Sequence, residues 1–413
     1  MCKGVPSGMP IKLRSLGDRA DPAQYPQRST RSRRPIPVPV NRLCEEARRK
    51  IPPGLKSHDW KLEIPDGTLE ASIMSNFSIG VDLGGTNLRI AAVDEHGQLL
   101  EKITLGTKVA RGKDHVIHEM TGAIQQLAAK HENAGALQGM GVGVPGIIDI
   151  KTGMLRESPN LPGWANSNVR EEIEERLGTR VILENDANAA ALGEKWLGAA
   201  RDVEDMAMLT LGTGVGGGIV FGGRIFHGMT GMAGEFGHIT VEPEGVPCPC
   251  GNRGCLEQYA SATAVVRMAR EAISSRRAGA LERAASSDPE FSAKAVYNLA
   301  IQGDVEAKRI FGRVGRALGI GIADLVNALN LPMYVVGGGV SSAWEAFSPF
   351  IFEELRQRSM VYAATAPASL IDGRGASAQV DPGGPTKTII TRALLGSDAG
   401  LYGAARLPMI GNS

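Results

Sequence analysis

The sequence contains few cysteines and no long apolar segment. Five of its 413 residues are cysteines, and so small and odd a number argues against a secreted protein held together by disulfides. No apolar run approaches the roughly 20 residues that a membrane-spanning helix needs, and no apolar segment of the kind found in secretory signals follows the start. We therefore expect a cytoplasmic protein with no membrane partner.

An excess of charge of one sign is also lacking. The formal net charge is +1, so the charge of the whole chain does not favour nucleic acid as a partner. A hydrophobic content of 43% and a charged content of 22% are ordinary for a globular protein. The length is sufficient for two domains, each with its own core.

Residues 1–73 differ in composition from the rest of the chain. They hold 14 Lys and Arg against 8 Asp and Glu, a net of +6, which leaves −5 for the remainder because the whole chain carries +1. Ten of the 23 prolines lie here. Such a segment cannot easily build a core, so we predict a basic, disordered extension in which Cys2 and Cys44 are incidental. Two alternatives are a basic contact through Arg31–Arg34 and a native start at Met74.

Glycine, in contrast, is abundant and clustered. A predicted strand over Phe77–Leu83 runs into Gly84-Gly85-Thr86-Asn87, and two further strands follow up to Leu105. The first glycine cluster therefore lies in a β-hairpin turn. A dinucleotide-binding fingerprint needs a strand followed by a helix, and a P-loop needs a following Lys-Ser or Lys-Thr, so neither of these sites is present.

Two more glycine clusters also follow predicted strands. Gly212–Gly218 lies between a strand predicted over Asp205–Leu211 and a partner strand, and Gly337–Gly339 follows a strand predicted over Met333–Val336. Two hairpin loops from two similar β-rich halves would face each other across a cleft and bind phosphate with backbone N–H groups. The third turn would lie near the nucleoside. Other predicted elements are helices over 115–132, 171–177 and 188–196 and strands over 137–150 and 180–184.

Seven motifs in this order resemble one known family. They are DLGGTN (82–87), GVPGIID (143–149), ENDANAAALGE (184–194), LGTGVGGG (211–218), GEFGH (234–238), CPCGNRGCLEQYAS (248–261) and VVGGG (335–339). From about Phe77 to Leu407 the chain resembles a ROK-family (repressor, open reading frame, kinase) sugar kinase, with most similarity to bacterial ATP-dependent glucokinases. The stretch Ala364–Thr386 departs from the family pattern as a longer loop.

The resemblance implies an α/β fold of the actin-like ATPase (ribonuclease H-like) type, with two lobes around a central cleft. The expected lobes are residues 74–187, with 393–413 packing back onto them, and residues 188–392, which carry a zinc knuckle. The implied activity is phosphorylation of D-glucose at its 6-hydroxyl by ATP with Mg²⁺, by a homodimer or homotetramer with a place in glycolysis. Alternatives are another hexose or N-acetylhexosamine as substrate (mannose, fructose, N-acetylmannosamine), polyphosphate as donor, or a sugar-responsive repressor. The repressor is disfavoured because the N-terminal segment shows no three-helix pattern.

Asp186 is the candidate catalytic residue. It follows the apolar run Val181–Leu183 and precedes the helix predicted from Asn188, so it could accept a proton from a sugar hydroxyl or merely cap the helix. Spacing alone leaves both roles open. The resemblance favours the general base and implies that Asn185 binds the sugar.

The other implied site residues fall into two groups. Asp82 suits Mg²⁺ held mostly through water, although it could simply cap a turn, and each glycine could serve turn geometry alone. The implied ATP and phosphate residues are Asp82, Gly84, Gly85, Thr86, Asn87, Gly212, Thr213, Gly214, Gly216, Gly337, Gly338 and Gly339. The implied sugar residues are Gly146, Asn160, Asn185, Asp186, Glu235, His238 and Glu257.

Three of the five cysteines lie in the nine-residue stretch PCPCGNRGC, at Cys248, Cys250 and Cys255. Cys248 and Cys250 are too close in sequence for a comfortable disulfide, and three thiols need a fourth ligand for tetrahedral Zn²⁺. His238 and His227 are the nearby candidates, with free thiols as the remaining alternative. The resemblance implies His238, and a full set of three Cys and one His would make the zinc structural. On this interpretation the zinc braces the sugar pocket through His238 and Glu257.

Overall fold

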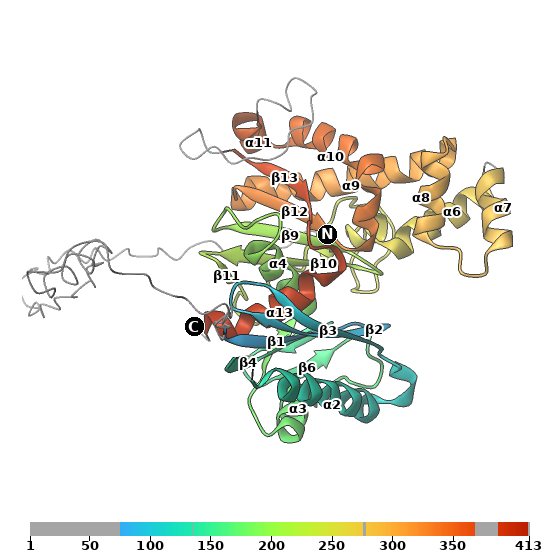
Figure 1. Cartoon of the computed structure of the whole chain (residues 1–413). Helices are drawn as coiled ribbons and strands as arrows, with labels where there is room; N and C mark the ends of the chain where they lie inside the picture. The colour runs from blue at the N-terminus through green and yellow to red at the C-terminus, as the bar shows by residue number, and fades with distance from the viewer. Residues whose placement is uncertain (1–74, 134, 276–277, 368–386, 412–413) are drawn as a thin grey trace, which may run out of the picture. The chain divides into compact units, whose positions relative to one another are not determined.

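The computed structural model describes residues 75–133, 135–275, 278–367 and 387–411. All of these belong to one compact unit, Ser72–Ser413 (Figure 1). The predicted extension over residues 1–73, with Cys2 and Cys44, and most of the loop predicted over 364–386 lie outside the described residues.

The first half is built on a five-stranded sheet with the order β3-β2-β1-β4-β8. The strands are β1 (Phe77–Leu83), β2 (Asn87–Asp94), β3 (Leu99–Gly106), β4 (Leu137–Val144) and β8 (Ile182–Asn185). The first three are antiparallel, and β4 and β8 are added in parallel. Apolar side chains of this sheet form a core with α2 (Lys113–His131) and α3 (Val169–Leu177), in which Trp164 is fully buried.

The second half repeats this arrangement. Its sheet has the order β11-β10-β9-β12-β13, again with three antiparallel strands and two added in parallel. The strands are β9 (Met206–Leu211), β10 (Val215–Phe221), β11 (Arg224–Ile225), β12 (Met333–Gly337) and β13 (Ile389–Arg392). The sequence predicted two similar β-rich halves, and the identical strand order confirms them.

A larger core is formed by the second sheet together with several helices. They are α5 (Glu257–Ala260), α6 (Ala262–Ser274), α7 (Gly279–Ser287), α8 (Ala293–Ile301), α9 (Val305–Leu329), α10 (Trp344–Arg358) and α11 (Met360–Thr365). Short 3₁₀ turns are η1 (Val109–Arg111), η2 (Phe236–His238), η3 (Gly339–Ala343) and η4 (Gly396–Asp398). None of the described helices has the length and apolar character needed to cross a membrane.

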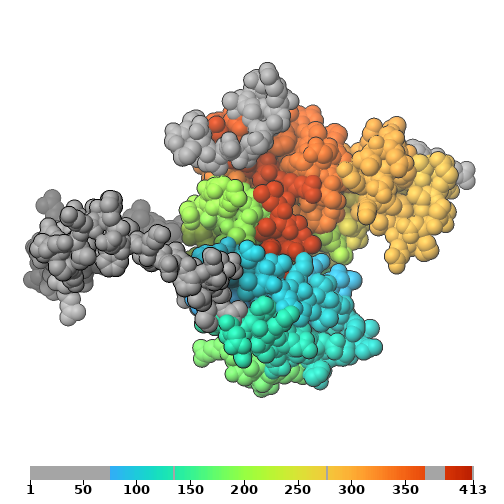
Figure 2. Space-filling model, in the orientation of Figure 1, coloured from blue at the N-terminus to red at the C-terminus, as the bar shows by residue number. Residues whose placement is uncertain are grey.

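Two helices connect the halves. Each follows the last parallel strand of one sheet: α4 (Asp186–Trp196) follows β8, and α13 (Ala399–Ile410) follows β13. They pack so closely that a Cβ added at Gly403 would lie 1.6 Å from the carbonyl oxygen of Ala189. The helix α13 also lies on the first sheet, where a Cβ added at Gly80 would lie 2.4 Å from the carbonyl oxygen of Leu401. Figure 2 shows this red C-terminal segment between the blue and the orange surface regions.

One predicted strand is wrong in its extent. The strand predicted over 137–150 is divided, because β4 ends at Val144 and a separate strand, β5 (Ile147–Asp149), pairs with β6 (Met154–Glu157) in a small sheet that includes β7 (Ser167–Asn168). Pro145 between them has no backbone N–H to donate, and Gly146 has a φ of +119°. The chain therefore turns out of the main sheet at these two residues.

Candidate active site

Two glycine loops occupy equivalent hairpin turns in the two sheets. Gly84–Thr86 joins β1 to β2, where the Gly84 N–H donates to the Asn87 carbonyl at 2.9 Å. Gly212–Gly214 joins β9 to β10, and α6 holds it through the Ala262 N–H, which donates to the Gly212 carbonyl at 2.8 Å. Both loops therefore lie in hairpins, as the sequence predicted. Gly216 lies beyond the loop, within β10, and faces Ala187 of α4.

The third glycine turn lies next to the second loop. Gly337 ends β12, Gly338 has a φ of +80°, and Gly339 begins η3. A Cβ added at Gly338 would lie 2.5 Å from the carbonyl oxygen of Leu211, the last residue of β9. Only glycine tolerates both this φ and this approach, so the third glycine turn lies directly beside the strand end that leads into the second loop.

Asp186 lies where β8 ends and α4 begins. The helix starts at Asp186 and not at Asn188, and its N-cap is Asn185, whose Oδ1 accepts from the N–H groups of Ala187 and Asn188. The alternative role of Asp186 as the N-cap is therefore wrong. Burial, followed by the negative charges of Asp82 and Glu235, raises the pKa of Asp186 to about 6.

Asp82 and Glu184 share a row of the first sheet with Gly143 between them. Asp82 of β1 pairs with Gly143 of β4, which pairs with Glu184 of β8. The Asp82 carboxylate accepts a hydrogen bond from Arg89 at 3.0 Å. Burial raises the pKa of Asp82, and the Arg89 guanidinium partly opposes this shift. The carboxyl ends of these parallel strands thus bring Asp82 close enough to Asp186 to affect its ionisation.

The predicted sugar residues of the first half lie around this edge. The Asn185 Nδ2 donates to the Gly146 carbonyl at 3.1 Å. A Cβ added at Gly146 would touch Ser158, and one added at Gly85 would lie 3.1 Å from the carbonyl oxygen of Asn160. The structure therefore brings Gly146, Asn160 and Asn185 together beside the first glycine loop.

The predicted sugar residues of the second half pack against β10. A Cβ added at Gly237 would lie 2.1 Å from the Val215 carbonyl oxygen, so the GEFGH segment lies directly on this strand. Glu257, in α5, accepts from the Val215 N–H at 2.9 Å through its Oε2. Glu257 thus connects the cysteine-rich segment to the second glycine loop, a contact that the sequence did not predict.

The three cysteines and His238 form a cluster whose ligand atoms lie within 4.8 Å of one another. The sulfurs of Cys250 and Cys255 are 3.7 Å apart, and the Cys248 sulfur lies 3.8 Å from His238 Nδ1. Zn–S bonds of about 2.3 Å at tetrahedral angles place two sulfurs about 3.8 Å apart, whereas a disulfide needs about 2.05 Å. The donor set therefore fits Zn²⁺. His227 is not part of it, because its Nε2 bonds to Glu184 Oε2 at 2.6 Å.

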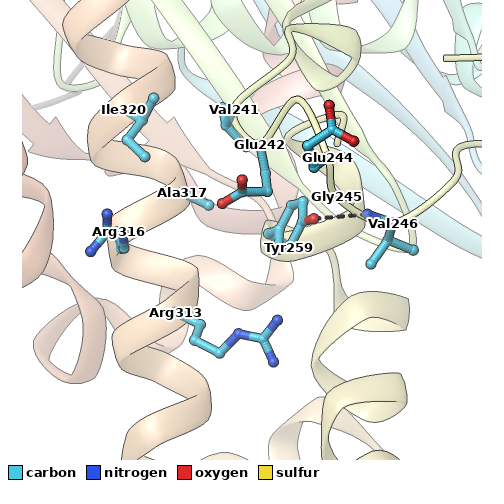
Figure 3. Close-up of a pocket in the computed structure, with 10 residues that line it drawn as sticks. All are labelled: Val241, Glu242, Glu244, Gly245, Val246, Tyr259, Arg313, Arg316, Ala317 and Ile320. Carbon is cyan, nitrogen blue, oxygen red and sulfur yellow. Dashed lines mark hydrogen bonds between the residues drawn. The ribbon is translucent and has the colours of Figure 1, made fainter. Parts of the chain in front are cut away.

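Two cavities flank this region. One, of about 810 Å³, lies beside Thr213 and is lined by Val266, Arg267, Arg270 and Phe291 among others. The other, of about 540 Å³, lies between the Val241–Val246 segment and α9 and contains none of the predicted site residues (Figure 3). In it the Tyr259 hydroxyl accepts from the Val246 N–H at 3.0 Å, which holds the segment before the cysteines against α5.

Sequence reasoning missed two partners of the site. Arg89 pairs with Asp82, and its place seven residues further along a hairpin is the available signal, because Asp82 and Arg89 are opposite each other in the β1–β2 register. His227 contacts Glu184 from the other half of the chain, and no local pattern in the sequence indicates that contact.

Comparisons with known proteins agree with this geometry. The ROK family model matches residues 78–408. A glucokinase from Thermotoga maritima is 41% identical over 284 residues, 69% of this chain and 87% of the relative. A xylose repressor from Caldicellulosiruptor bescii is 32% identical over 68% of this chain and 71% of its own length.

The solved structures give the same result for the fold. A ROK family glucokinase from Streptomyces griseus, in complex with glucose and AMPPNP, is 33% identical with a TM-score of 0.62, and the match covers 81% of this chain and all of that one. The ROK sugar kinases of known structure have the actin-like ATPase fold in two domains, so the predicted fold class is confirmed.

Proposed function

The chain belongs to the ROK family, and we propose that it is a sugar kinase that transfers the γ-phosphoryl group of ATP to the 6-hydroxyl of D-glucose. The observation that carries this proposal is Asp186. It begins α4 near Asp82, which precedes the first glycine hairpin, and the next residue, Ala187, meets Gly216 just beyond the second. Burial with neighbouring carboxylates raises the pKa of Asp186 to about 6. A general base of this kind is most effective when its pKa lies near the working pH. The curated relatives named glucokinase support glucose as the acceptor.

Asp186 would take the proton of the 6-hydroxyl as the oxygen attacks the γ-phosphorus. The backbone N–H groups of the loops Gly84–Thr86 and Gly212–Gly214, with Asn87 beside the first, would bind the phosphates. The Asp82 carboxylate suits Mg²⁺ held mostly through water, and this ion would neutralise the charge of the phosphates. Catalysis then consists mainly of alignment and charge stabilisation, as expected for phosphoryl transfer.

The sugar would be held by polar groups from both halves. Asn160, Asn185 and the Gly146 backbone would contribute from the first half, and Glu235, His238 and Glu257 from the second. Since His238 Nδ1 faces the cysteine sulfurs, its Nε2 remains for a sugar hydroxyl. We propose a structural Zn²⁺ in the cluster of His238 and the three cysteines, which would fix this ring orientation.

The nucleoside would occupy the cavity beside Thr213. Phe291 and Val266 offer apolar contact there, and Arg267 and Arg270 offer positive charge. Gly338 of the turn Gly337–Gly339 lies against Leu211, the residue before the loop Gly212–Gly214. We further propose that residues 74–187, with 393–413, and residues 188–392 act as two lobes, and that the enzyme works as a cytoplasmic homodimer or homotetramer.

The test is a coupled assay of kcat/KM with ATP across glucose, mannose, fructose and N-acetylmannosamine. We expect glucose to give the highest value and the variant Asp186→Asn to lose at least about 10²-fold in kcat. A higher kcat/KM with another hexose would identify that hexose, and not glucose, as the substrate. No turnover of any sugar, together with a DNA mobility shift that sugar reverses, would replace the kinase with a repressor.

A further inference from the structure

The contact between His227 and Glu184 joins the two segments that are proposed to hold the sugar. Glu184 is the residue before Asn185 and has a side chain that is only 3% exposed. Its Oε1 accepts from the Asn185 N–H at 2.9 Å and from Asn188 Nδ2 at 3.0 Å, and its Oε2 bonds to His227 Nε2 at 2.6 Å. Every polar atom of this carboxylate therefore orients a neighbour of Asp186 or contacts His227.

His227 comes from the other half of the chain. It lies two residues beyond β11, and its carbonyl accepts from the Ala233 N–H at 3.2 Å, which closes the loop 228–232. The tip of this loop reaches the first half, since a Cβ added at Gly231 would lie 3.0 Å from the Ile148 carbonyl oxygen. The loop leads directly into Glu235, whose charge acts on Asp186.

The charges make this contact more than packing. A buried carboxylate needs a charged or hydrogen-bonding partner, and in the described part of the chain no other Lys, Arg or His forms an ion pair with Glu184. The hydrogen bond to Glu184 raises the pKa of His227, although burial opposes this. The imidazole is thus the partner of a buried carboxylate directly before Asn185, beside a site where the charges of Asp82 and Glu235 already act on Asp186.

We propose that His227 is a positioning residue of the sugar site, which holds Glu184 and thereby fixes Asn185 and the start of α4 that carries Asp186. It touches neither the phosphates nor the sugar. It also anchors the base of the loop that leads to Glu235, so that both sugar-binding segments share one support. This inference rests on the proposed kinase function.

Two substitutions that differ by one methylene group test it. Gln places its amide nitrogen where His has Nε2, whereas Asn places it where His has Nδ1, too short to reach Glu184. The histidine side chain is 35% exposed, so both polar substitutions suit its surroundings. Met229→Ala is the matched control, because this side chain lies on the same loop and is 94% exposed.

We expect His227→Asn to lower kcat/KM for glucose by about 10- to 100-fold, since small misplacement of a reacting group has effects of this size, while KM for ATP changes by less than about twofold. His227→Gln should stay within about threefold of the wild type because it keeps the donor. In the double variant with Glu184→Gln, His227→Asn should cost less than it does alone, because no unpaired charge remains.

The inference is overturned if His227→Asn has wild-type kinetics, or if Asn and Gln reduce activity equally. It is also overturned if KM for ATP rises as much as KM for glucose, because that outcome indicates a general structural defect. Glucose binding without ATP, measured by calorimetry, should weaken in His227→Asn and remain in His227→Gln. An inactive wild-type enzyme in the same assay would instead refute the proposed function.

Discussion

Replacing Asp186 with Asn should make the ligand-free protein more stable while it abolishes catalysis. The pKa of this carboxyl rises from 3.8 to about 6 on folding, because burial and the charge of Asp82 disfavour the ionised form. Each pKa unit corresponds to about 1.4 kcal/mol, so ionised Asp186 destabilises the folded state by about 2 to 3 kcal/mol at neutral pH. Asparagine has nearly the same shape, keeps an oxygen acceptor for the Ala187 N–H and carries no charge.

The direction of the pH dependence follows from the raised pKa. A carboxyl with a raised folded pKa favours the folded state fully below pH 3.8 and loses this contribution as the pH rises through about 6. The free energy of unfolding of Asp186→Asn minus that of the wild type should therefore increase from acid pH and level off above about pH 6.5. Urea unfolding of both ligand-free proteins at pH 5 to 8 measures this difference. We expect it to grow by about 1 to 2 kcal/mol across that range.

Asp149→Asn supplies a control with the opposite sign. Hydrogen bonds, first of all from the Thr152 backbone, lower the pKa of this exposed carboxyl. Its contribution is fully present above the unfolded pKa of 3.8 and is lost only below it, so this variant should be less stable than the wild type by a constant amount across pH 5 to 8. The electrostatic origin of the raised pKa of Asp186 would be refuted by either of two results. One is an Asp186→Asn protein that is less stable than the wild type at pH 7, and the other is a difference in the free energy of unfolding that does not vary with pH.

Three further perturbations test other parts of the site. Cys250→Ala should lose bound zinc, raise KM for glucose about tenfold and lower the melting temperature, and normal glucose kinetics in a variant shown to be zinc-free would contradict the brace. Gly214→Ala should raise KM for ATP about tenfold, because the new Cβ would lie 2.3 Å from Glu257 Oε2. Gly122→Ala in α2 is the control: its Cβ meets nothing within 4 Å, so it should leave the kinetics unchanged. Glu194→Gln should lower the free energy of unfolding by about 2 to 3 kcal/mol, since this fully buried carboxylate accepts from the N–H groups of Ala199, Leu394 and Leu395; unchanged urea unfolding would exclude that role.

The hairpin character of the glycine loops could be predicted from sequence because it depends on local pattern. Short apolar runs on both sides of Gly84–Thr86 and of Gly212–Gly214 indicate strands, and no helical period follows either loop. Pro145 also predicts the break in the strand expected over 137–150, since proline has no N–H for the hydrogen bonds of a central strand. It was missed because the apolar run continues through Ile147 and Ile148.

The contacts between the halves could not be predicted in this way. Glu184 and His227 are 43 residues apart, and their meeting depends on how α4 lies on β10, which is set by backbone packing at Gly216 and Gly218. The bond between Glu257 and the Val215 N–H lies within the second half, but it joins residues 42 apart and no local pattern indicates it either. A sequence pattern shows which side chains could take part in a site, but the packing of elements distant in the sequence decides which of them meet.

The repeated fold places a carboxylate at the start of the connecting helix in each half. The two carboxylates differ in whether a cation lies beside them. Asp186 begins α4 after β8, and Asp398 precedes α13 after β13. Asp398 pairs with Lys102 at 2.8 Å and Asp82 pairs with Arg89 at 3.0 Å, whereas no ion pair with Asp186 occurs among residues 75–411 that the structure describes. A carboxylate beside a cation keeps its charge and is a weak base, while one crowded by like charges gains affinity for a proton. On our proposal, Arg89 partly offsets the raised pKa of Asp82, whereas no cation among the described residues offsets that of Asp186, and this difference leaves Asp186 as the proton acceptor of the site.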